Sequence, residues 1–263
     1  MDINRFYSPL QNKETHIFKN KIKYVDYFLF DFDGTIYPDN LLLNLTLNFL
    51  DNYNGENSMF KLKHKALIQL IKDKNKYNFL ELSLLFAKIL KNIPCNELNK
   101  KIPSFLNRCY PHSLNFIRTI QQNNKKCFLV SLTSEAIATE VVKQFGFDDY
   151  WCRKLERNNH NGIEVFSGKY SEDVSDLLEF KKSCLSKFGI GKEEHFLMAG
   201  NGFEDIMLFD LAHIKIGINP EKKLLNNNIN FDMILKGKKD PWQDFAKIIQ
   251  QHSKLSAYSE LNK

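Results

Sequence analysis

The amino-acid sequence predicts an α/β fold in which a parallel sheet is flanked by helices and a small all-helical domain interrupts the chain after the first strand. Three observations lead to this prediction. Short apolar runs alternate with segments of helical periodicity, which is the pattern of a parallel sheet. A long, purely helical block separates the first of these runs from the second. Carboxylate or hydroxyl residues follow three of the strands, where open α/β sheets bind ligands.

The first predicted strand ends in two carboxylates. The aromatic run at 27–30 is typical of a buried strand, and it leads into Asp31, Asp33 and Gly34, which permits a turn. Side chains two positions apart lie on the same side of a strand, so the two carboxylates share a face if the strand geometry continues. Such a pair repels itself unless a cation neutralises it, and Mg²⁺ is the simplest candidate. An ordinary acidic turn after a strand is the alternative interpretation.

A helical block follows this turn. Its segments carry apolar residues three and four positions apart, as amphipathic helices do, and no strand pattern interrupts them. The block is longer than a crossover between two parallel strands requires, so it predicts a small helical domain over residues 38–110. Its leucines and phenylalanines are interpreted as core rather than ligand contacts. The helical segments are 41–51, 58–72, 79–91 and 95–110.

The second strand is predicted at 127–130, after a helix at 113–123, and it ends at Ser131. A further helix is predicted to begin near residue 135. Hydroxyls and backbone N–H groups at a helix start bind phosphate, because the helix dipole and the unpaired N–H groups point there. The same residues also serve as an ordinary helix N-cap. Ser131, Thr133 and Ser134 are the hydroxyl residues available at this position.

Two short strands are predicted between residues 145 and 168, joined by a turn near 158–162, and they carry no evident chemistry. The next segment, 176–188, has the apolar spacing of a helix. It contains Lys181 and Lys182, which point about 100° apart on a helix, so only one of them can face a common site. A solvated surface charge is the plain interpretation of either lysine.

The third strand, at 195–199, is followed by the sequence Gly-Asn-Gly-Phe-Glu-Asp at 200–205. Two glycines bracket Asn201, and Asp205 begins a helix. Because the carboxyl ends of parallel strands meet at one edge of a sheet, Asp205 is expected near the first pair of carboxylates. Glu204 is interpreted as a solvated neighbour. The remaining elements are a strand at 213–218, an edge strand at 231–235 and a helix at 241–251.

Composition narrows the class of protein. The formal net charge is +6 and the lysines are scattered, so nucleic-acid binding is not expected, although a mild positive field favours anionic substrates. The 5 cysteines are dispersed, which predicts neither a zinc site nor a disulfide framework. The first twenty residues lack the apolar core of a signal peptide, and no apolar run reaches the ~18 residues that span a bilayer. We therefore expect a cytoplasmic protein without a membrane partner. The sequence does not indicate its oligomeric state.

Taken together, four motifs resemble those of the haloacid dehalogenase superfamily, in the capped subgroup that is similar to phosphoserine phosphatase. They are Asp-x-Asp-Gly-Thr at 31–35, the strand ending in Ser131, Lys181 in a Lys-x-x-x-Leu spacing, and the 200–205 segment. The resemblance spans roughly residues 24–235. It implies a Rossmann-like core made of 1–37 and 111–263, and a C1 cap over 38–110. Such a cap covers the site and selects the substrate.

The resemblance also implies the role of each site residue. Asp31 is the nucleophile that becomes an aspartyl-phosphate, and Asp33 is the general acid/base. Phosphate binding falls to Gly34, Ser131, Leu132 and Lys181, and Mg²⁺ binding to Asp31, Asp33, Asp205 and Asn201. An Asp is more usual in the family where this chain has Asn201, and a neutral amide attracts Mg²⁺ less strongly. The implied activity is Mg²⁺-dependent hydrolysis of a small phosphomonoester.

Three features bear on the alternatives. Phosphoserine phosphatase carries a Glu nine positions after its nucleophile to hold the substrate amine, and this chain has Asn40 there, which favours a different phosphomonoester. An acid/base residue at Asp33 favours phosphate chemistry over dehalogenation. A phosphotransferase that passes the phosphoryl group to another hydroxyl is the alternative within the enzyme class. A catalytically silent fold that serves as a binding protein is the other, and Asn201 is the feature that supports it.

Overall fold

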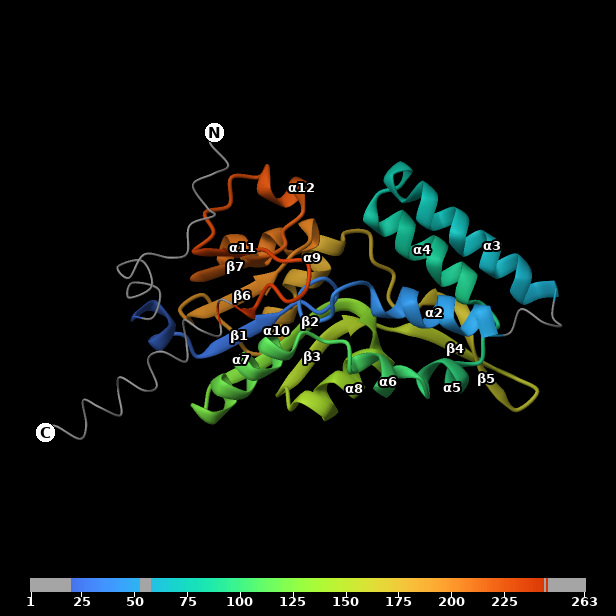
Figure 1. Cartoon of the computed structure of the whole chain (residues 1–263), viewed down its shortest axis with the longest axis horizontal. Coiled ribbons are helices and arrows are strands. Elements are labelled where there is room, and N and C mark those ends of the chain that lie inside the picture. Colours follow the sequence, from blue (N-terminus) through green and yellow to red (C-terminus); the bar gives the residue numbers. More distant parts are fainter. Residues whose placement is uncertain (1–19, 53–57, 244, 246–263) are drawn as a thin grey trace, which may run out of the picture.

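The structure, a computed structural model, describes residues 20–52, 58–243 and 245. Six parallel strands form one sheet in the order β3-β2-β1-β6-β7-β8 (Figure 1). This arrangement confirms the predicted parallel α/β fold. The strands are β1 (Tyr27–Phe30), β2 (Lys126–Ser134), β3 (Asp149–Arg153), β6 (Phe196–Gly200), β7 (Ile214–Ile218) and β8 (Met233–Leu235).

Both faces of the sheet are buried, which explains why its central strand is apolar throughout. Phe28 and Phe30 of β1 make edge contacts with Phe116 of α7 on one face. Leu29 points to the other face, into an apolar cluster with residues of α10 and α11. The helices of this part of the chain are α7 (Pro111–Gln122), α8 (Glu135–Phe145), α9 (Leu177–Lys182), α10 (Cys184–Lys187), α11 (Ile206–Leu211) and α12 (Lys222–Leu225).

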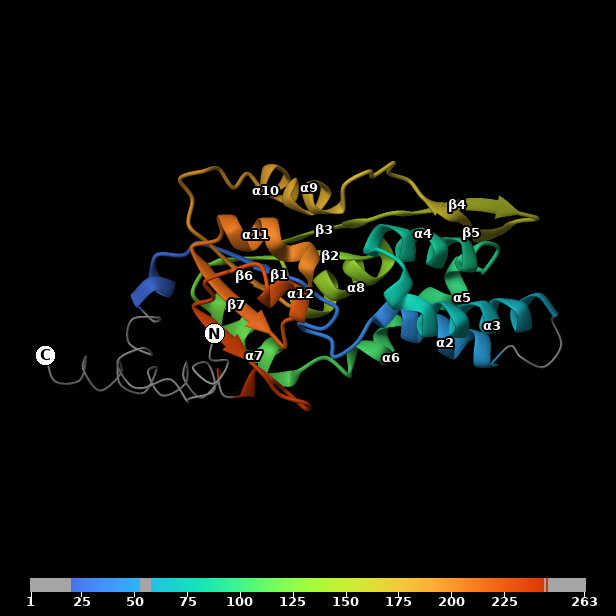
Figure 2. The ribbon, with the colours of Figure 1, turned by 90° about the horizontal axis from the view of Figure 1, so that it is seen from above.

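A helical insert follows β1, as predicted, and both views place it at one end of the molecule (Figures 1 and 2). The hairpin of β4 (Leu155–His160) and β5 (Ile163–Tyr170) packs against it. Asn92 donates a backbone hydrogen bond to Phe166 of β5 at 2.8 Å, and Phe166 donates to Ile93 at 3.1 Å. The predicted boundaries assign this hairpin to the core, and the division into core and cap stays a prediction. The insert contains α2 (Leu41–Asn52), α3 (Ser58–Asp73), a short 3₁₀ turn η2 (Lys74–Lys76), α4 (Phe79–Leu90), α5 (Cys95–Asn99) and α6 (Ile102–Leu106).

Several predicted elements differ in extent. The segment 95–110 forms two short helices rather than one. The helix predicted over 176–188 divides at Ser183, whose hydroxyl donates to the Phe180 carbonyl at 2.6 Å and so competes with regular helical bonding. Residues 20–23 are helical. Most of the helix predicted at 241–251 lies outside the described residues.

The topology brings the ends of β1 and β6 together. The chain passes from β1 to β2 on one side and returns to β6 on the other, so β1 lies at the switch point of the strand order. Asp31, directly after β1, donates its backbone N–H to Ala199 of β6 at 2.9 Å. Ligands of open α/β sheets bind at such a point. Within the described ranges, no helix combines the length and apolar character needed to cross a membrane.

Candidate active site

A buried lysine joins the two carboxylates that follow β1 and β6. The Lys181 ammonium lies 3.0 Å from Asp31 Oδ1 and 2.5 Å from Asp205 Oδ1. Only 1% of the lysine is exposed, and the two aspartates are 3% and 0% exposed. Burial lowers the pKa of Lys181, but the carboxylates of Asp205 and Asp31 outweigh this and raise it, so the lysine stays charged. Three residues that are far apart in the sequence thus form one ionic cluster.

The turn after β6 holds Asp205 in place. Its Oδ2 accepts hydrogen bonds from the backbone N–H groups of Asn201 and Gly202, both at 3.2 Å. A Cβ added at Gly200 would lie 2.3 Å from this oxygen, so a residue without a side chain is required there. Burial, opposed by Lys181 and supported by Asp31, raises the pKa of Asp205. One oxygen of Asp205 is thus held by the turn after β6, while the other contacts Lys181.

Thr35 and Asn201 form a second link between the two strand ends. The Thr35 hydroxyl lies 3.3 Å from Asp31 Oδ2 and 3.2 Å from Asn201 Oδ1. Two reasons require glycine at position 34. Its φ is +79°, and a Cβ there would lie 2.2 Å from the Asn201 amide nitrogen. The Gly34 N–H donates to Tyr37 O at 2.7 Å. Phosphate binding by Gly34 stays a prediction, and sequence reasoning gave Thr35 no role although it lies within the first motif.

Asp33 faces the start of the insert. Its Oδ1 accepts a hydrogen bond from the Leu41 N–H at 2.8 Å, and its Oδ2 accepts one from the Asn40 amide at 3.2 Å. Burial raises its pKa to about 8, with a further contribution from Asp31 and an opposing one from the Leu41 hydrogen bond. Asp33 therefore carries a proton at neutral pH. The orienting contact from Asn40 was not foreseen from the sequence.

The other predicted phosphate ligands lie on β2 and α9. Strand β2 continues beyond the predicted end to Ser134, and its Leu129 is paired with Phe30, so Ser131 lies at the same edge as Asp31. Ser131 is buried, and its Oγ accepts from the Thr133 N–H at 3.3 Å. Leu132 follows it on the strand. Lys182 is half-buried and pairs with Glu179 at 3.2 Å, so the structure brings Lys181, and not Lys182, to the carboxylates.

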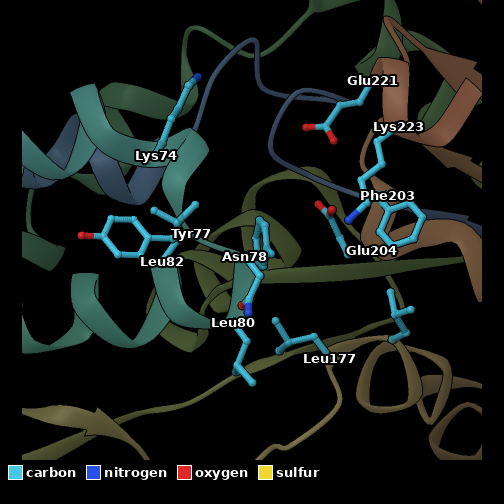
Figure 3. A pocket seen from close by; sticks show the side chains of 12 residues that line it. Lys74, Tyr77, Asn78, Leu80, Leu82, Leu177, Phe203, Glu204, Glu221 and Lys223 are labelled. Atoms are coloured by element: carbon cyan, nitrogen blue, oxygen red, sulfur yellow. The ribbon is translucent and has the colours of Figure 1, made fainter.

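Glu204 differs most from its predicted environment. The sequence interpretation made it a solvated neighbour, but it is half-buried beside the ionic cluster. Burial raises its pKa to about 7, against the opposing charge of Lys181 and with a contribution from Asp31. Figure 3 shows its carboxylate pointing toward the helical insert. It therefore belongs to the wall between the ionic cluster and the insert.

These observations define a carboxylate and lysine centre at the switch point of a parallel α/β sheet. The sequence profile of the haloacid dehalogenase-like hydrolases matches residues 28–183, more than half of the chain. The chain belongs to this hydrolase family. No curated protein matches the sequence.

Solved structures share the fold at low sequence identity. A phospho-aspartyl intermediate analogue of phosphoserine phosphatase has a TM-score of 0.62 at 18% identity, over 86% of this chain and 98% of that one. A substrate-bound phosphoserine phosphatase has a TM-score of 0.63 at 17% identity, with the same 86% and 98% coverage. A phosphoserine phosphohydrolase-like protein from Francisella tularensis has a TM-score of 0.57 at 13% identity, over 86% of this chain and 100% of that one. At these identities the likeness concerns the fold alone.

Proposed function

We propose that the protein is a Mg²⁺-dependent phosphatase that hydrolyses a small phosphomonoester through an aspartyl-phosphate on Asp31. The observation that carries this proposal is the buried Lys181, in contact with both Asp31 and Asp205 at the ends of adjacent strands. A fixed positive charge beside a carboxylate nucleophile stabilises the phosphoryl oxygens as charge develops on them. Family membership and the shared fold of phosphoserine phosphatase structures support the same reaction class.

The first step forms the covalent intermediate. A carboxylate oxygen of Asp31 attacks phosphorus in line, and the bond between phosphorus and the ester oxygen breaks. Asp33 transfers its proton to the departing oxygen, so that a neutral alcohol leaves. Its pKa of about 8 keeps this proton available at neutral pH. Lys181, Ser131 and the backbone after Ser131 are proposed to hold the other phosphoryl oxygens.

The second step releases phosphate. A water molecule attacks phosphorus and gives its proton to the Asp33 carboxylate, which is now ionised. The bond between phosphorus and the Asp31 oxygen breaks, and this restores the carboxylate. The hydrogen bonds from Leu41 and Asn40 hold Asp33 in one orientation through both proton transfers.

The residues present suit Mg²⁺, a cation that prefers oxygen ligands. Asp31, Asp205, the Asn201 amide oxygen and the backbone carbonyl of Asp33 would hold it. Burial raises the pKa of Asp205, against the opposing charge of Lys181 and with smaller contributions from Asp31 and Glu204. In the part of the chain that the structure describes, no three acidic, His or Cys side chains form a metal cluster, so the set depends on amide and carbonyl oxygens. When bound, Mg²⁺ supplies electrophilic stabilisation of the phosphoryl oxygens.

The test is phosphate release from p-nitrophenyl phosphate, with Mg²⁺ and with EDTA. We expect turnover with Mg²⁺ and its loss in EDTA, with recovery when excess Mg²⁺ is restored. Equal rates under both conditions in a purified preparation would contradict the metal requirement. An added alcohol that accelerates p-nitrophenol release while lowering the yield of free phosphate would indicate the alternative, a phosphotransferase. Absence of turnover together with absence of Mg²⁺ binding by calorimetry would favour a silent binding protein.

Asn201→Asp is expected to strengthen Mg²⁺ binding. The substitution keeps the oxygen that accepts from Thr35 and adds a negative charge to the proposed ligand set. An added charged ligand raises the affinity of a site for a divalent cation, and we expect the half-saturating Mg²⁺ concentration to fall about tenfold. The measurement is a Mg²⁺ titration of activity, with calorimetry. Asn115→Asp, on the exposed side of α7, adds the same charge away from the site and should change nothing. An unchanged Mg²⁺ affinity in Asn201→Asp would contradict the placement of this residue.

A further inference from the structure

A cavity of about 460 Å³ lies between the helical insert and the carboxyl edge of the sheet (Figure 3). One wall comes from the start of α4 and the residues before it, including Asn78, Phe79 and Leu80. The opposite wall includes Leu177 at the start of α9 and Phe203 in the turn η3 (Phe203–Asp205). Pockets of roughly 300–1,000 Å³ enclose most of a drug-sized molecule. The space is therefore larger than a three-carbon alcohol requires.

The cavity adjoins the ionic cluster through Glu204. This residue lines the cavity, and its carboxylate interacts electrostatically with Lys181 and Asp31 on its other side. The charge of Glu204 also contributes to the raised pKa of Asp33, the proposed proton donor to the leaving group. A phosphoryl group held at Asp31 would thus have this cavity as the adjacent space for the rest of its molecule.

Apolar side chains make up the larger part of the lining, and Lys74, Glu221 and Lys223 add charged groups to it. Leu80, Leu177 and Phe203 present hydrocarbon to it from the two walls. Phe79 is 46% exposed and Tyr77 is 39% exposed, although both are large apolar side chains. Exposed apolar groups gathered around one cavity indicate a ligand that removes them from water. A small polar alcohol would leave them in contact with water.

Asn40 gives a separate argument against a small amino alcohol. The family resemblance places the group that holds a substrate amine at this position. In the structure both ends of the Asn40 amide are engaged within the chain. Its nitrogen donates to Asp33 at 3.2 Å, and its oxygen accepts from the Leu43 N–H at 2.8 Å. Its contacts orient the proposed acid and cap α2.

We propose that the substrate is a phosphomonoester of a bulky, largely apolar alcohol, whose hydrocarbon body occupies the cavity between α4 and η3. This inference rests on the proposed phosphatase function and adds the class of leaving group to it. The insert selects the substrate through Phe79 and Leu80, while Leu177 and Phe203 form the fixed wall. The phosphoryl group lies at Asp31 and the alcohol oxygen beside Asp33.

The test compares ligands that differ only by a phenyl ring. Activity is measured with 2-phenylethyl phosphate and ethyl phosphate, whose leaving alcohols have similar acidity. Binding is measured by calorimetry, with Mg²⁺ present, using the matched phosphonates 3-phenylpropylphosphonate and propylphosphonate, which cannot be hydrolysed. Burial of the ring predicts a preference of about ten- to a hundredfold in kcat/KM and in Kd. The phosphonate binding measurement gives its result whether or not the protein hydrolyses any ester. Failure of the proposed phosphatase activity can therefore be distinguished from failure of the proposed substrate class.

Leu80→Gln is expected to reduce this preference about fivefold or more, because it replaces cavity hydrocarbon by an amide with little change in helix propensity. Leu84→Gln, on the same helix, 42% exposed and outside the cavity lining, is the matched control and should keep the full preference. Equal binding of the two phosphonates by the unmodified protein would overturn the proposal. So would a preference that survives Leu80→Gln but is lost in Leu84→Gln.

Discussion

Asp31→Asn is expected to reduce Mg²⁺-dependent phosphate release by at least about 10⁴-fold, a loss of the size seen when an enzyme loses its nucleophile. An amide nitrogen or oxygen does not attack phosphorus at a useful rate, and no aspartyl-phosphate can form. The substitution keeps the shape of the side chain and one oxygen to accept from Lys181 or Thr35. The fold should therefore survive, as circular dichroism and the melting temperature will show.

Two further measurements connect the loss of activity to the nucleophile. Acid-quenched protein mixed with a saturating substrate should carry a phosphoryl adduct by intact mass, and the Asp31→Asn variant should carry none. Asp39→Asn is the matched control, because Asp39 lies in the same loop but is exposed, with its carboxylate 3.5 Å from Arg108. It should retain normal activity and normal labelling. Full activity of Asp31→Asn in a clean preparation would remove Asp31 from the mechanism.

The strand ends were the part of the site that the sequence could predict. Each carboxylate follows an apolar run within a few residues, so the sequence alone could place Asp31 and Asp205 at one edge of the sheet. Their shared contact with Lys181 is known only from the structure. The choice of Lys181 over Lys182 depended on the Lys-x-x-x-Leu spacing of the family resemblance. The two residues are of the same type and adjacent in one predicted helix, so nothing else in the sequence distinguishes them. In the structure Lys181 is fully buried and contacts the carboxylates, whereas Lys182 is only half-buried and pairs with Glu179.

Features that depend on contacts between distant segments were not predictable in this way. Glu204 was interpreted as a solvated neighbour, yet residues of the insert, more than a hundred positions earlier, line the same cavity. The same holds for Arg153, which is 1% exposed, stacks on Tyr170 and donates to Ser83 of α4 at 2.9 Å. This contact joins a strand of the sheet to the insert. Local periodicity carries no information about such pairings.

Asn40 gave partial information. The sequence showed that it replaces the Glu expected for a phosphoserine phosphatase, which argued against that substrate. The sequence did not show where the amide would turn, because that depends on how the chain leaves the first motif. Its hydrogen bonds to Asp33 and from Leu43 close a loop between β1 and α2. The sequence showed only that Asn40 stands where a Glu was expected, whereas in the structure Asn40 positions the proposed acid, Asp33.

Lys181→Met is expected to lower kcat by about 10²- to 10³-fold, the usual effect of removing one group that stabilises charge in a transition state. It should also destabilise the metal-free protein by about 3–5 kcal/mol, because it leaves buried carboxylates without their counter-charge. Both Asp31 and Asp205 lose their contact with the ammonium. The two effects are measured by steady-state kinetics with saturating Mg²⁺ and by urea unfolding in EDTA.

Two controls, the addition of Mg²⁺ and a variant of the neighbouring lysine, distinguish loss of the Lys181 charge from misfolding of the variant. If Mg²⁺ binds the same carboxylates, it should restore much of the stability of Lys181→Met but little of its kcat, since the phosphoryl oxygens still lack the ammonium. Lys182→Met is the matched control, because Lys182 is one residue away and pairs with Glu179 rather than with the buried aspartates. Loss of that pair should change stability by no more than about 0.5 kcal/mol and leave kcat unchanged. A variant at Lys182 that is more damaging than the one at Lys181 would contradict the ionic cluster as the catalytic centre. A Lys181→Met protein with normal kcat would show that the buried cation serves folding alone, because its charge would then make no difference to the transferred phosphoryl group.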